Sequence, residues 1–184
     1  RAISQEPETL RRYAEEFAGE PDIDDIKKVY ERYQRHLREN NALDFDDLLN
    51  ETRNLLAHNK DALDYLSSRF RYILVDEFQD TNQVQNAIFR AVSDGGRKLF
   101  MVGDVKQSIY RFRLADPDIF LDKYEHYDHA EEAQEGKGRK ILLSSNFRSG
   151  GAVLEATNDV FYRCMSQRVG DLKYTVQEAL AEGI

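Results

Sequence analysis

Two adjacent carboxylates, Asp76 and Glu77, follow a short apolar run in the string ILVDEFQD at residues 73–80. An aspartate in this position can hold Mg²⁺ through its water shell, and the glutamate beside it can orient and deprotonate an attacking water. Paired acids also end strands and cap the following helix in many α/β proteins, with no chemistry attached. The pair therefore indicates a hydrolytic site only in combination with other residues.

A second polar string, GDVKQSIYRFR at residues 103–113, follows another apolar run. The amide of Gln107 can donate to a phosphate oxygen and accept from water. Beyond it, Tyr110, Phe112 and Arg113 belong to an alternation of aromatic and cationic side chains that suits stacking on bases and neutralising phosphates of a single strand. The alternative is that the two rings pack in a core while the arginines are solvated.

A third string, LLSSNFRS at residues 142–149, again follows apolar residues. Its arginine, Arg148, has a guanidinium fork that can clamp a phosphate, and the ring of Phe147 can form a stacking platform for a purine. The alternative is a surface arginine near the start of a helix. Three such strings, each at the end of a predicted strand, together indicate a nucleotide site more strongly than any one of them.

The strings have to be positioned by the elements that precede them. Residues 71–78, 98–104 and 140–144 are short apolar runs typical of buried parallel strands, and a helical stretch at residues 83–92 connects the first two. A strand, a helix and a strand within about 30 residues form a parallel crossover unit. Both acid-terminated strands should then point their carboxyl ends at one edge of the sheet, where open α/β sheets bind ligands.

The rest of the chain is mainly helical or polar. Residues 6 to about 70 have apolar side chains at spacings of three and four, which predicts amphipathic helices interrupted near Asn40 and Asn41. The stretch from residue 22 onward places five apolar side chains on one face: Ile26, Val29, Tyr30, Tyr33 and Leu37. A polar stretch at residues 128–139 predicts an exposed loop, and Ser149 is expected to open a further helix. Residues from 167 onward are polar and predict no particular element.

The composition limits the possible functions. With 184 residues, of which 41% are hydrophobic and 33% charged, the chain can bury one compact core and a satellite helical lobe. Its net charge of -8 argues against a free-standing, high-affinity nucleic-acid binder. The single cysteine, Cys164, cannot form an internal disulfide, and no apolar run reaches the about 18 residues that a bilayer requires. We therefore expect a cytoplasmic protein without membrane contact and, because it begins with Arg1, one cut from a longer chain.

The three strings, in this order, resemble motifs II, III and IV of the UvrD/Rep family of superfamily 1 helicases. Two further segments, DFDDLL at residues 44–49 and VGDLKY at 169–174, make the chain similar to the helicase/nuclease subunits of that family. The resemblance covers roughly residues 43–174. It implies an α/β fold: a partial RecA-like P-loop NTPase domain, with a parallel sheet and flanking helices, preceded by a helical accessory lobe.

The resemblance also implies a division of the chain. Residues 1–66 would be the accessory lobe inserted in the first motor domain, residues 67–145 part of that first RecA-like domain, and residues 146–184 the start of the second motor domain. Each residue singled out above receives a role: Asp76 binds Mg²⁺, Glu77 is the general base, Gln107 and Arg148 contact the γ-phosphate, Phe147 lies near adenine, and Tyr110, Phe112 and Arg113 face DNA. Phe112 stands where many relatives carry tryptophan, which keeps the stacking with a smaller ring.

The implied activity is that of an ATP-dependent 3′ to 5′ DNA helicase/nuclease subunit in recombinational repair of double-strand breaks. Such a subunit uses ATP and Mg²⁺, acts on single-stranded DNA and duplex ends, forms a heterodimer with a partner subunit, and works in the bacterial cytoplasm. The sequence contains no G-x-x-x-x-G-K-[ST] loop to cradle the phosphates. We therefore expect an internal piece that does not hydrolyse ATP alone and whose parent carries the exonuclease elsewhere.

Two other classes of function stay open at this point. A different P-loop ATPase would lack the aromatic and arginine string after Gln107, which is present here. A non-catalytic scaffold that only grips DNA or a partner would be expected to lose Glu77 or Gln107, and both are intact. The sequence favours the helicase without excluding the scaffold.

Overall fold

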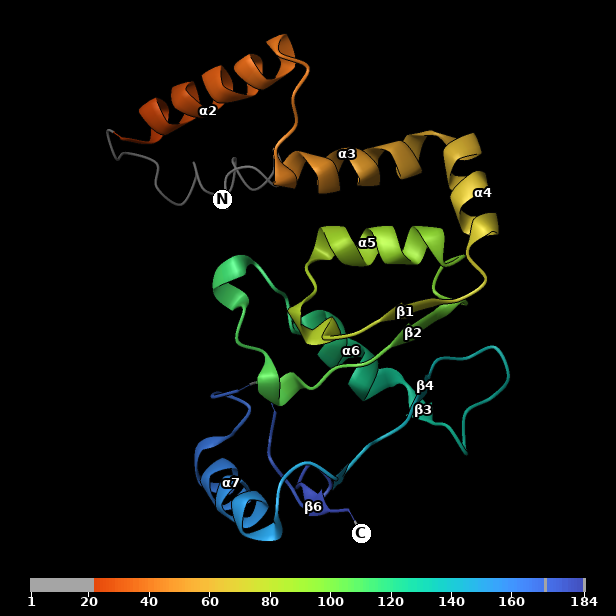
Figure 1. Ribbon diagram of the computed structural model, residues 1–184, viewed down its shortest axis with the longest axis vertical. Helices are drawn as coiled ribbons and strands as arrows, with labels where there is room; N and C mark the ends of the chain where they lie inside the picture. Colours follow the sequence, from red (N-terminus) through yellow and green to blue (C-terminus); the bar gives the residue numbers. More distant parts are fainter. Residues whose placement is uncertain (1–21, 171, 184) are drawn as a thin grey trace. The chain divides into compact units, whose positions relative to one another are not determined.

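The computed structural model describes residues 22–170 and 172–183, and these divide into two compact units (Figure 1). Of the described residues, 22–73 and Gln83–Leu99 belong to the first unit, and Leu74–Asn82 and those from Phe100 onward belong to the second. The helical stretch predicted at residues 6–20 lies outside the described residues. In what is described, helices and short strands follow one another in the mixed α/β order that the sequence predicts.

The first unit is built from helices α2 (Asp22–Glu39), α3 (Phe45–His58), α4 (Lys60–Arg69) and α5 (Gln83–Val92). Helix α3 begins at a capping box, because the Asp44 side chain accepts from the Asp47 N–H at 2.7 Å and the Asp47 side chain accepts from the Asp44 N–H at 3.2 Å. Such reciprocal bonds satisfy backbone donors that a helix start otherwise leaves free. Helix α3 then packs against both α4 and α5 (Figure 1).

The apolar face predicted on α2 is formed but stays largely open to solvent. Val29 is 68% exposed and Tyr33 46% exposed. The helix is held to the start of α3 by polar contacts instead, since Tyr33 Oη donates to Asp44 Oδ2 at 3.1 Å. The helix is thus amphipathic, as predicted, and its apolar side is only partly covered, since Tyr30 and Leu37 are half-buried.

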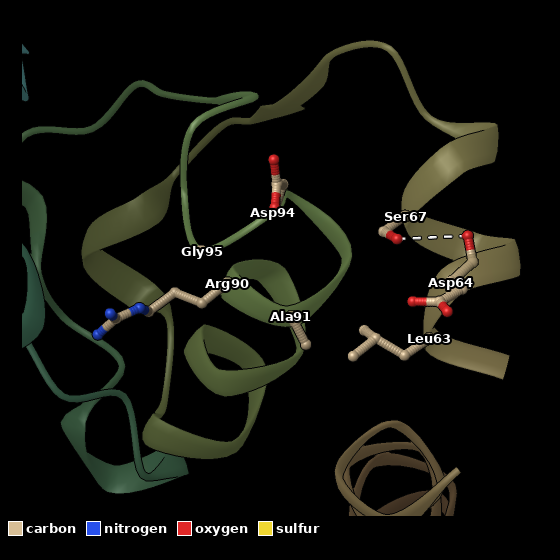
Figure 2. Close-up of a pocket in the computed structure, with 7 residues that line it drawn as sticks. All are labelled: Leu63, Asp64, Ser67, Arg90, Ala91, Asp94 and Gly95. Atoms are coloured by element: carbon tan, nitrogen blue, oxygen red, sulfur yellow. Dashed lines mark hydrogen bonds between the residues drawn. The ribbon is translucent and has the colours of Figure 1, made fainter. Parts of the chain in front are cut away.

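A pocket of about 400 Å³ lies between α4 and α5 in the first unit (Figure 2). Leu63 and Ala91 supply its apolar lining, and Asp64 and Asp94 supply carboxylates. Ser67 also lines it and donates through its hydroxyl to the Asp64 carbonyl. None of the residues predicted to act on nucleotide or DNA contributes to this pocket.

Strands β1 (Ile73–Val75) and β2 (Leu99–Met101) pair in a two-stranded sheet. The Val102 N–H donates to the Val75 carbonyl at 2.8 Å just beyond the strand ends. The strands are shorter than the apolar runs predict, and Leu74 is 74% and Phe100 55% exposed. Burial on both faces, which the runs predicted, is therefore not observed.

The second unit continues through three short 3₁₀ turns and two helices, α6 and α7. The turns are η1 (Phe78–Asp80), η2 (Val105–Gln107) and η3 (Arg111–Arg113), and the helices are α6 (Asp118–His126) and α7 (Gly151–Cys164). Helix α6 packs on η1, with the rings of Phe78 and Phe120 6.0 Å apart. The buried apolar residues of this unit are Phe78, Val105, Ala115, Ile119, Leu121, Leu154 and Tyr174.

The third predicted strand, at residues 140–144, is not formed as one strand. Two-residue strands stand at either side of it: β4 (Arg139–Lys140) pairs in parallel with β3 (Asp128–His129), and β5 (Ser145–Asn146) pairs in parallel with β6 (Ala181–Glu182). Between them, Ile141 is 67% and Leu143 83% exposed. An apolar run becomes a strand only beside a hydrogen-bonded neighbour, and within the described chain backbone bonding begins only at Ser144, whose carbonyl accepts from the Ala181 N–H at 2.9 Å.

The helix expected to open at Ser149 begins two residues later, with Gly150 at its N-cap. The Ser149 N–H instead donates to Asn146 Oδ1 at 2.9 Å, and the Arg148 N–H shares the same acceptor at 2.9 Å. The asparagine side chain thus closes a turn of the kind that competes with helix initiation.

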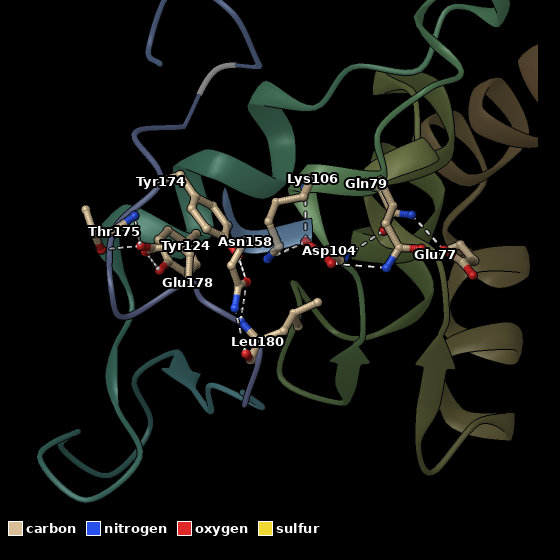
Figure 3. Close-up of polar contacts among 11 residues, drawn as sticks. Glu77, Gln79, Asp104, Lys106, Tyr124, Asn158, Tyr174, Thr175, Glu178 and Leu180 are labelled. Atoms are coloured by element: carbon tan, nitrogen blue, oxygen red, sulfur yellow. Dashed lines mark hydrogen bonds and ion pairs between the residues drawn. The ribbon is translucent and has the colours of Figure 1, made fainter. Parts of the chain in front are cut away.

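The segment after residue 167 is anchored, although its sequence predicted no element. Tyr174 Oη donates to Asn158 Oδ1 at 2.6 Å, and Asn158 Nδ2 donates to the Leu180 carbonyl at 2.9 Å (Figure 3). Tyr124 Oη donates to Glu178 Oε1 at 2.8 Å. Helices α6 and α7 therefore both hold this segment through side chains that come from distant parts of the sequence.

No described helix combines the length and the apolar character needed to cross a bilayer. The two compact units are defined by contacts within this chain alone. The division into residues 1–66, 67–145 and 146–184 that the resemblance implies stays a prediction.

Candidate nucleotide and DNA site

The turn after β1 holds the predicted acid pair. Glu77 has a left-handed backbone, with φ 51° and ψ 40°, which costs a non-glycine residue about 1–2 kcal/mol. The neighbouring contacts impose this conformation: Asp76 Oδ1 accepts from the Glu77 N–H at 2.9 Å, and the next residue, the fully buried Phe78, donates its N–H to the Val102 carbonyl at 2.9 Å. Strain of this kind is typical of functional sites. Both carboxylates are exposed.

The side chain of Gln79 bridges the segments that follow β1 and β2 (Figure 3). Its Nε2 donates to Glu77 Oε2 at 2.6 Å, and its Oε1 accepts from the Asp104 N–H at 3.0 Å. The side chain is only 1% exposed. A Cβ at Gly103 would lie 2.6 Å from Gln79 Oε1, so a glycine is required where the amide passes the backbone.

Asp104 carries this network on to Gln107. Its Oδ1 accepts from the Lys106 N–H at 3.0 Å and lies 2.8 Å from Lys106 Nζ, while its Oδ2 accepts from Gln107 Nε2 at 3.0 Å. The structure thus connects Glu77 with Gln107, two residues predicted to serve one site, through Gln79 and Asp104. The sequence prediction that the two strand ends meet is confirmed by these contacts, whereas the roles of the residues stay predictions.

Gln79 is the residue that sequence reasoning missed. Gln79 lies within the string ILVDEFQD, but no periodicity or charge in the sequence distinguishes it from a surface glutamine. A signal was nevertheless available: Gly103 stands at the end of the second apolar run, and a glycine inside or at the end of a strand often marks close approach of another group.

Asp80 adds a further polar group to the same turn. Among the described residues its Oδ1 is buried and has no hydrogen-bond partner. Burial raises the pKa of the Asp80 carboxyl, and the negative charge of Glu77 raises it further. The turn therefore contains three acids in five residues, and one of them, Asp80, is buried at one carboxylate oxygen.

The donor set is compatible with Mg²⁺ bound jointly by protein and substrate. Within the described residues no group of three or more His, Cys, Asp or Glu side chains converges on a point where it could hold a metal ion. A magnesium ion in a nucleotide site needs less, because one or two carboxylates, waters and the phosphates of the substrate complete its shell. Exposed oxygen donors on Asp76 fit that requirement.

The aromatic and arginine residues of the second string form an exposed cluster at η3. Arg113 Cζ lies 5.4 Å from the centre of the Tyr110 ring and 5.6 Å from that of Phe112, and the two rings are 5.8 Å apart. Phe112 is 77% exposed and Tyr110 38% exposed. The alternative that both rings pack in a core is therefore wrong, and a ring face and a cation are presented to solvent together.

Phe147 and Arg148 lie in the turn after β5. Phe147 is 78% exposed, and its ring passes so close to Gly183 that a Cβ there would clash with it. The Arg148 side chain is exposed. In the described part of the chain, neither side chain makes a hydrogen bond or ring contact with Asp76, Glu77 or Gln107, so the structure does not bring the third string into the network.

Comparisons with known proteins agree with the resemblance, and the family match includes the first two of the three strings. The family model of the UvrD/REP helicase N-terminal domain matches residues 3–128. An ATP-dependent helicase/nuclease subunit from Streptococcus pneumoniae is 46% identical over 144 residues, which are 78% of this chain and 11% of that protein. An exonuclease/helicase subunit RexA from Lactococcus lactis subsp. cremoris is 41% identical over 158 residues, 86% of this chain and 13% of that protein.

The chain thus spans only about a tenth of the length of the curated relatives that it matches. The bridged turns after β1 and β2 lie within the residues that the family model matches. Because the family model matches residues 3–128 and agrees with the resemblance found in the sequence, the chain belongs to the UvrD/REP helicase family.

Proposed function

We propose that this chain is the segment of an ATP-dependent DNA helicase/nuclease subunit of the AddA type that supplies the magnesium, water and γ-phosphate contacts of the ATP site. The observation that carries the proposal is the hydrogen-bonded series Glu77, Gln79, Asp104, Gln107. It links an acid suited to activate water with an amide suited to sense a phosphate. Asp104, which contacts Lys106 and Gln107, fixes the loop that presents this amide.

In this proposal Glu77 orients the attacking water and accepts its proton, with Oε2 held by Gln79 and Oε1 directed to the water. Gln107 contacts the γ-phosphate, and Asp76 would hold Mg²⁺, which when bound neutralises charge on the phosphates. Arg148 adds a guanidinium to the γ-phosphate when the two motor domains close, and Phe147 stacks near adenine. Closure is required because the described chain alone leaves these two residues outside the network.

The cluster of Tyr110, Phe112 and Arg113 is the DNA-facing part of the proposal. Its exposed rings can stack on bases, and its cation can pair with a phosphate. The overall charge of -8 opposes strong binding by this segment alone, so these residues act as a local contact within a larger DNA path. Movement along a single strand in the 3′ to 5′ direction follows from the family resemblance.

The finer assignments rest on the family resemblance, and the names of the relatives support only a helicase and nuclease activity in a subunit. They include an exonuclease located elsewhere in the full-length subunit, an AddB-type partner in a heterodimer, duplex ends and single-stranded DNA as substrates, and a role in double-strand break repair. A bacterial cytoplasmic location goes with this proposal. Residues 1–66, 67–145 and 146–184 are assigned to the accessory lobe, the first motor domain and the start of the second.

The decisive experiment replaces Glu77 with glutamine in the full-length subunit. Turnover of ATP should fall to background because the base is gone, while nucleotide affinity, measured with a fluorescent ATP analogue, stays within about two-fold. Asp64→Asn, a carboxylate of the first unit outside the network, is the matched control and should leave turnover unchanged. Wild-type unwinding by the Glu77→Gln protein would overturn the assignment of the base, whereas a wild-type subunit that does not turn over ATP would favour the non-catalytic scaffold.

A further inference from the structure

Gln79 uses both ends of its carboxamide although almost none of the side chain reaches solvent. One end donates to the Glu77 carboxylate at 2.6 Å, and the other accepts from the Asp104 backbone at 3.0 Å. Resting on the function proposed for Glu77 and Gln107, we propose that Gln79 is a positioning residue that sets the general base and the γ-phosphate-sensing loop together. It touches neither substrate nor metal in this proposal and acts only through its two neighbours.

The chemistry at this position calls for an amide. A single group must donate to a carboxylate at one end and accept from a backbone N–H at the other, and the carboxamide of glutamine or asparagine does both at every pH. Asparagine is one methylene shorter and cannot span the same distance from the same backbone. A glutamate would place a second carboxylate against Glu77, and a methionine would fill the space without making either hydrogen bond.

The surroundings fit the amide closely. Gly103 leaves room for Gln79 Oε1 to reach the Asp104 N–H, because a Cβ there would approach within 2.6 Å of Oε1. The adjacent Phe78 is fully buried and fixes the turn, and Glu77 is already strained into the left-handed region. A carboxylate on a strained backbone holds one orientation only when a partner fixes it, and Gln79 is that partner.

The same amide connects the base to the loop at residues 104–107. Gln107 Nε2 donates to Asp104 Oδ2 at 3.0 Å, so a displacement of Gln107 on meeting a phosphate is passed to Asp104. The Asp104 N–H holds Gln79, which in turn holds Glu77 (Figure 3). Loss of the amide should therefore harm the chemical step more than substrate binding.

The test uses the full-length subunit with its partner and compares Gln79→Met, Gln79→Glu and the wild type. Gln79→Met should lower kcat about 10- to 100-fold with less than about three-fold change in KM for ATP, since misplacing a catalytic group by about 1 Å has effects of this size. Ile119→Val, a buried residue of α6 outside the network, is the control for lost packing and should keep kcat within about two-fold.

The Gln79→Glu variant supplies a readout that packing alone cannot move. Two carboxyl groups this close share a proton, which raises the apparent pKa of the pair. At low pH the shared proton replaces the amide hydrogen and holds Glu77 in place; as pH rises through the raised pKa, both groups ionise and repel. The ratio of variant to wild-type kcat should therefore fall as pH rises from about 6 to 9.

The outcomes separate the two proposals. If Glu77→Gln abolishes turnover while Gln79→Met has wild-type kcat, or while the Gln79→Glu ratio is flat with pH, the positioning role of Gln79 is overturned and the proposed function stands. If Glu77→Gln leaves turnover intact, the proposed function itself fails. If Gln79→Met does not fold, the pH profile of Gln79→Glu decides between the outcomes. That profile compares the kcat of one variant protein at different pH values, so a general loss of stability does not produce it.

Discussion

The guanidinium carbon of Arg113 lies 5.4 Å from the centre of the Tyr110 ring, and the neighbouring Phe112 ring is stacked near the same cation and 77% exposed. A cation that lies near two exposed ring faces is less free to rotate than an isolated surface arginine. This geometry distinguishes the two contributions that such a cluster makes to single-strand binding: the ring stacks on a base, and the arginine neutralises a phosphate.

The two contributions should separate in a salt titration of the full-length subunit. Phe112→Ala is expected to weaken single-stranded DNA binding by about 1–3 kcal/mol with an unchanged salt slope, because only stacking is lost. Arg113→Ala should lower the slope of log affinity against log salt by about one. ATP turnover should persist in both variants. Unchanged affinity of Phe112→Ala at fixed salt would count against a stacking role.

The 184-residue chain alone is expected to show no ATP hydrolysis above background. It contains no loop of backbone amides and lysine to cradle the β- and γ-phosphates, so nothing in it fixes ATP against Glu77. The measurement is phosphate release at saturating ATP, with and without single-stranded DNA. Activity that disappears in the Glu77→Gln chain would contradict this expectation, whereas activity that persists in it would indicate a contaminating enzyme.

Much of the site was predictable because strand ends are predictable. The apolar runs before Asp76 and before Gly103 located β1 and β2, and the crossover rule brought their carboxyl ends together. The contact between Gln79 and the Asp104 N–H, 25 residues apart, could not be derived in the same way. A buried side chain that bridges two turns leaves no periodic trace in the sequence.

The failures have a common physical cause. The run at residues 141–144 is apolar enough for a strand, but strand formation depends on a hydrogen-bonded neighbour that can lie anywhere in the sequence. The polar segment after residue 167 predicted no element for the same reason, because Tyr174 and Glu178 are fixed by partners on α7 and α6. Local sequence patterns therefore predict helices and strands, whereas the residues that they pair with are determined by tertiary contacts.

Arg148 should be needed for turnover but not for the fold of this chain. Its side chain is exposed. The adjacent turn is closed by the backbone N–H groups of Arg148 and Ser149, which both donate to Asn146 Oδ1, and a substitution of the Arg148 side chain leaves these bonds intact. Arg148→Ala in the full-length subunit is therefore expected to lower kcat at least about ten-fold, and Arg148→Lys to restore it only in part, because a lysine lacks the bidentate fork. Equal activity of the lysine variant and the wild type would argue for a simple charge effect.

The hydrogen bond between Tyr124 and Glu178 should make the stability of this chain depend on pH at both extremes. Burial raises the pKa of Tyr124 to about 12, and the bond to the Glu178 carboxylate raises it too. Burial alone would raise the pKa of Glu178, but hydrogen bonds from Thr175 and Tyr124 outweigh it and leave that pKa lowered. The bonded pair consists of a neutral phenol and an ionised carboxylate.

Tyr124→Phe should reduce the free energy of unfolding by about 1.5–3 kcal/mol near neutral pH, the usual contribution of a hydrogen bond to a charged group. The raised tyrosine pKa means that this difference is complete below the ordinary value of 10.0 and is lost as pH rises to about 12. The lowered Glu178 pKa means that the stability difference is also lost as pH falls below 4.5.

Urea denaturation of the chain across pH measures the loss at high pH and the loss at low pH. Tyr162→Phe is the control, because the Tyr162 hydroxyl makes no hydrogen bond within the described residues. A difference between Tyr124→Phe and wild type that stays constant from about pH 3 to 12 would show that the hydroxyl contributes through packing rather than through the carboxylate.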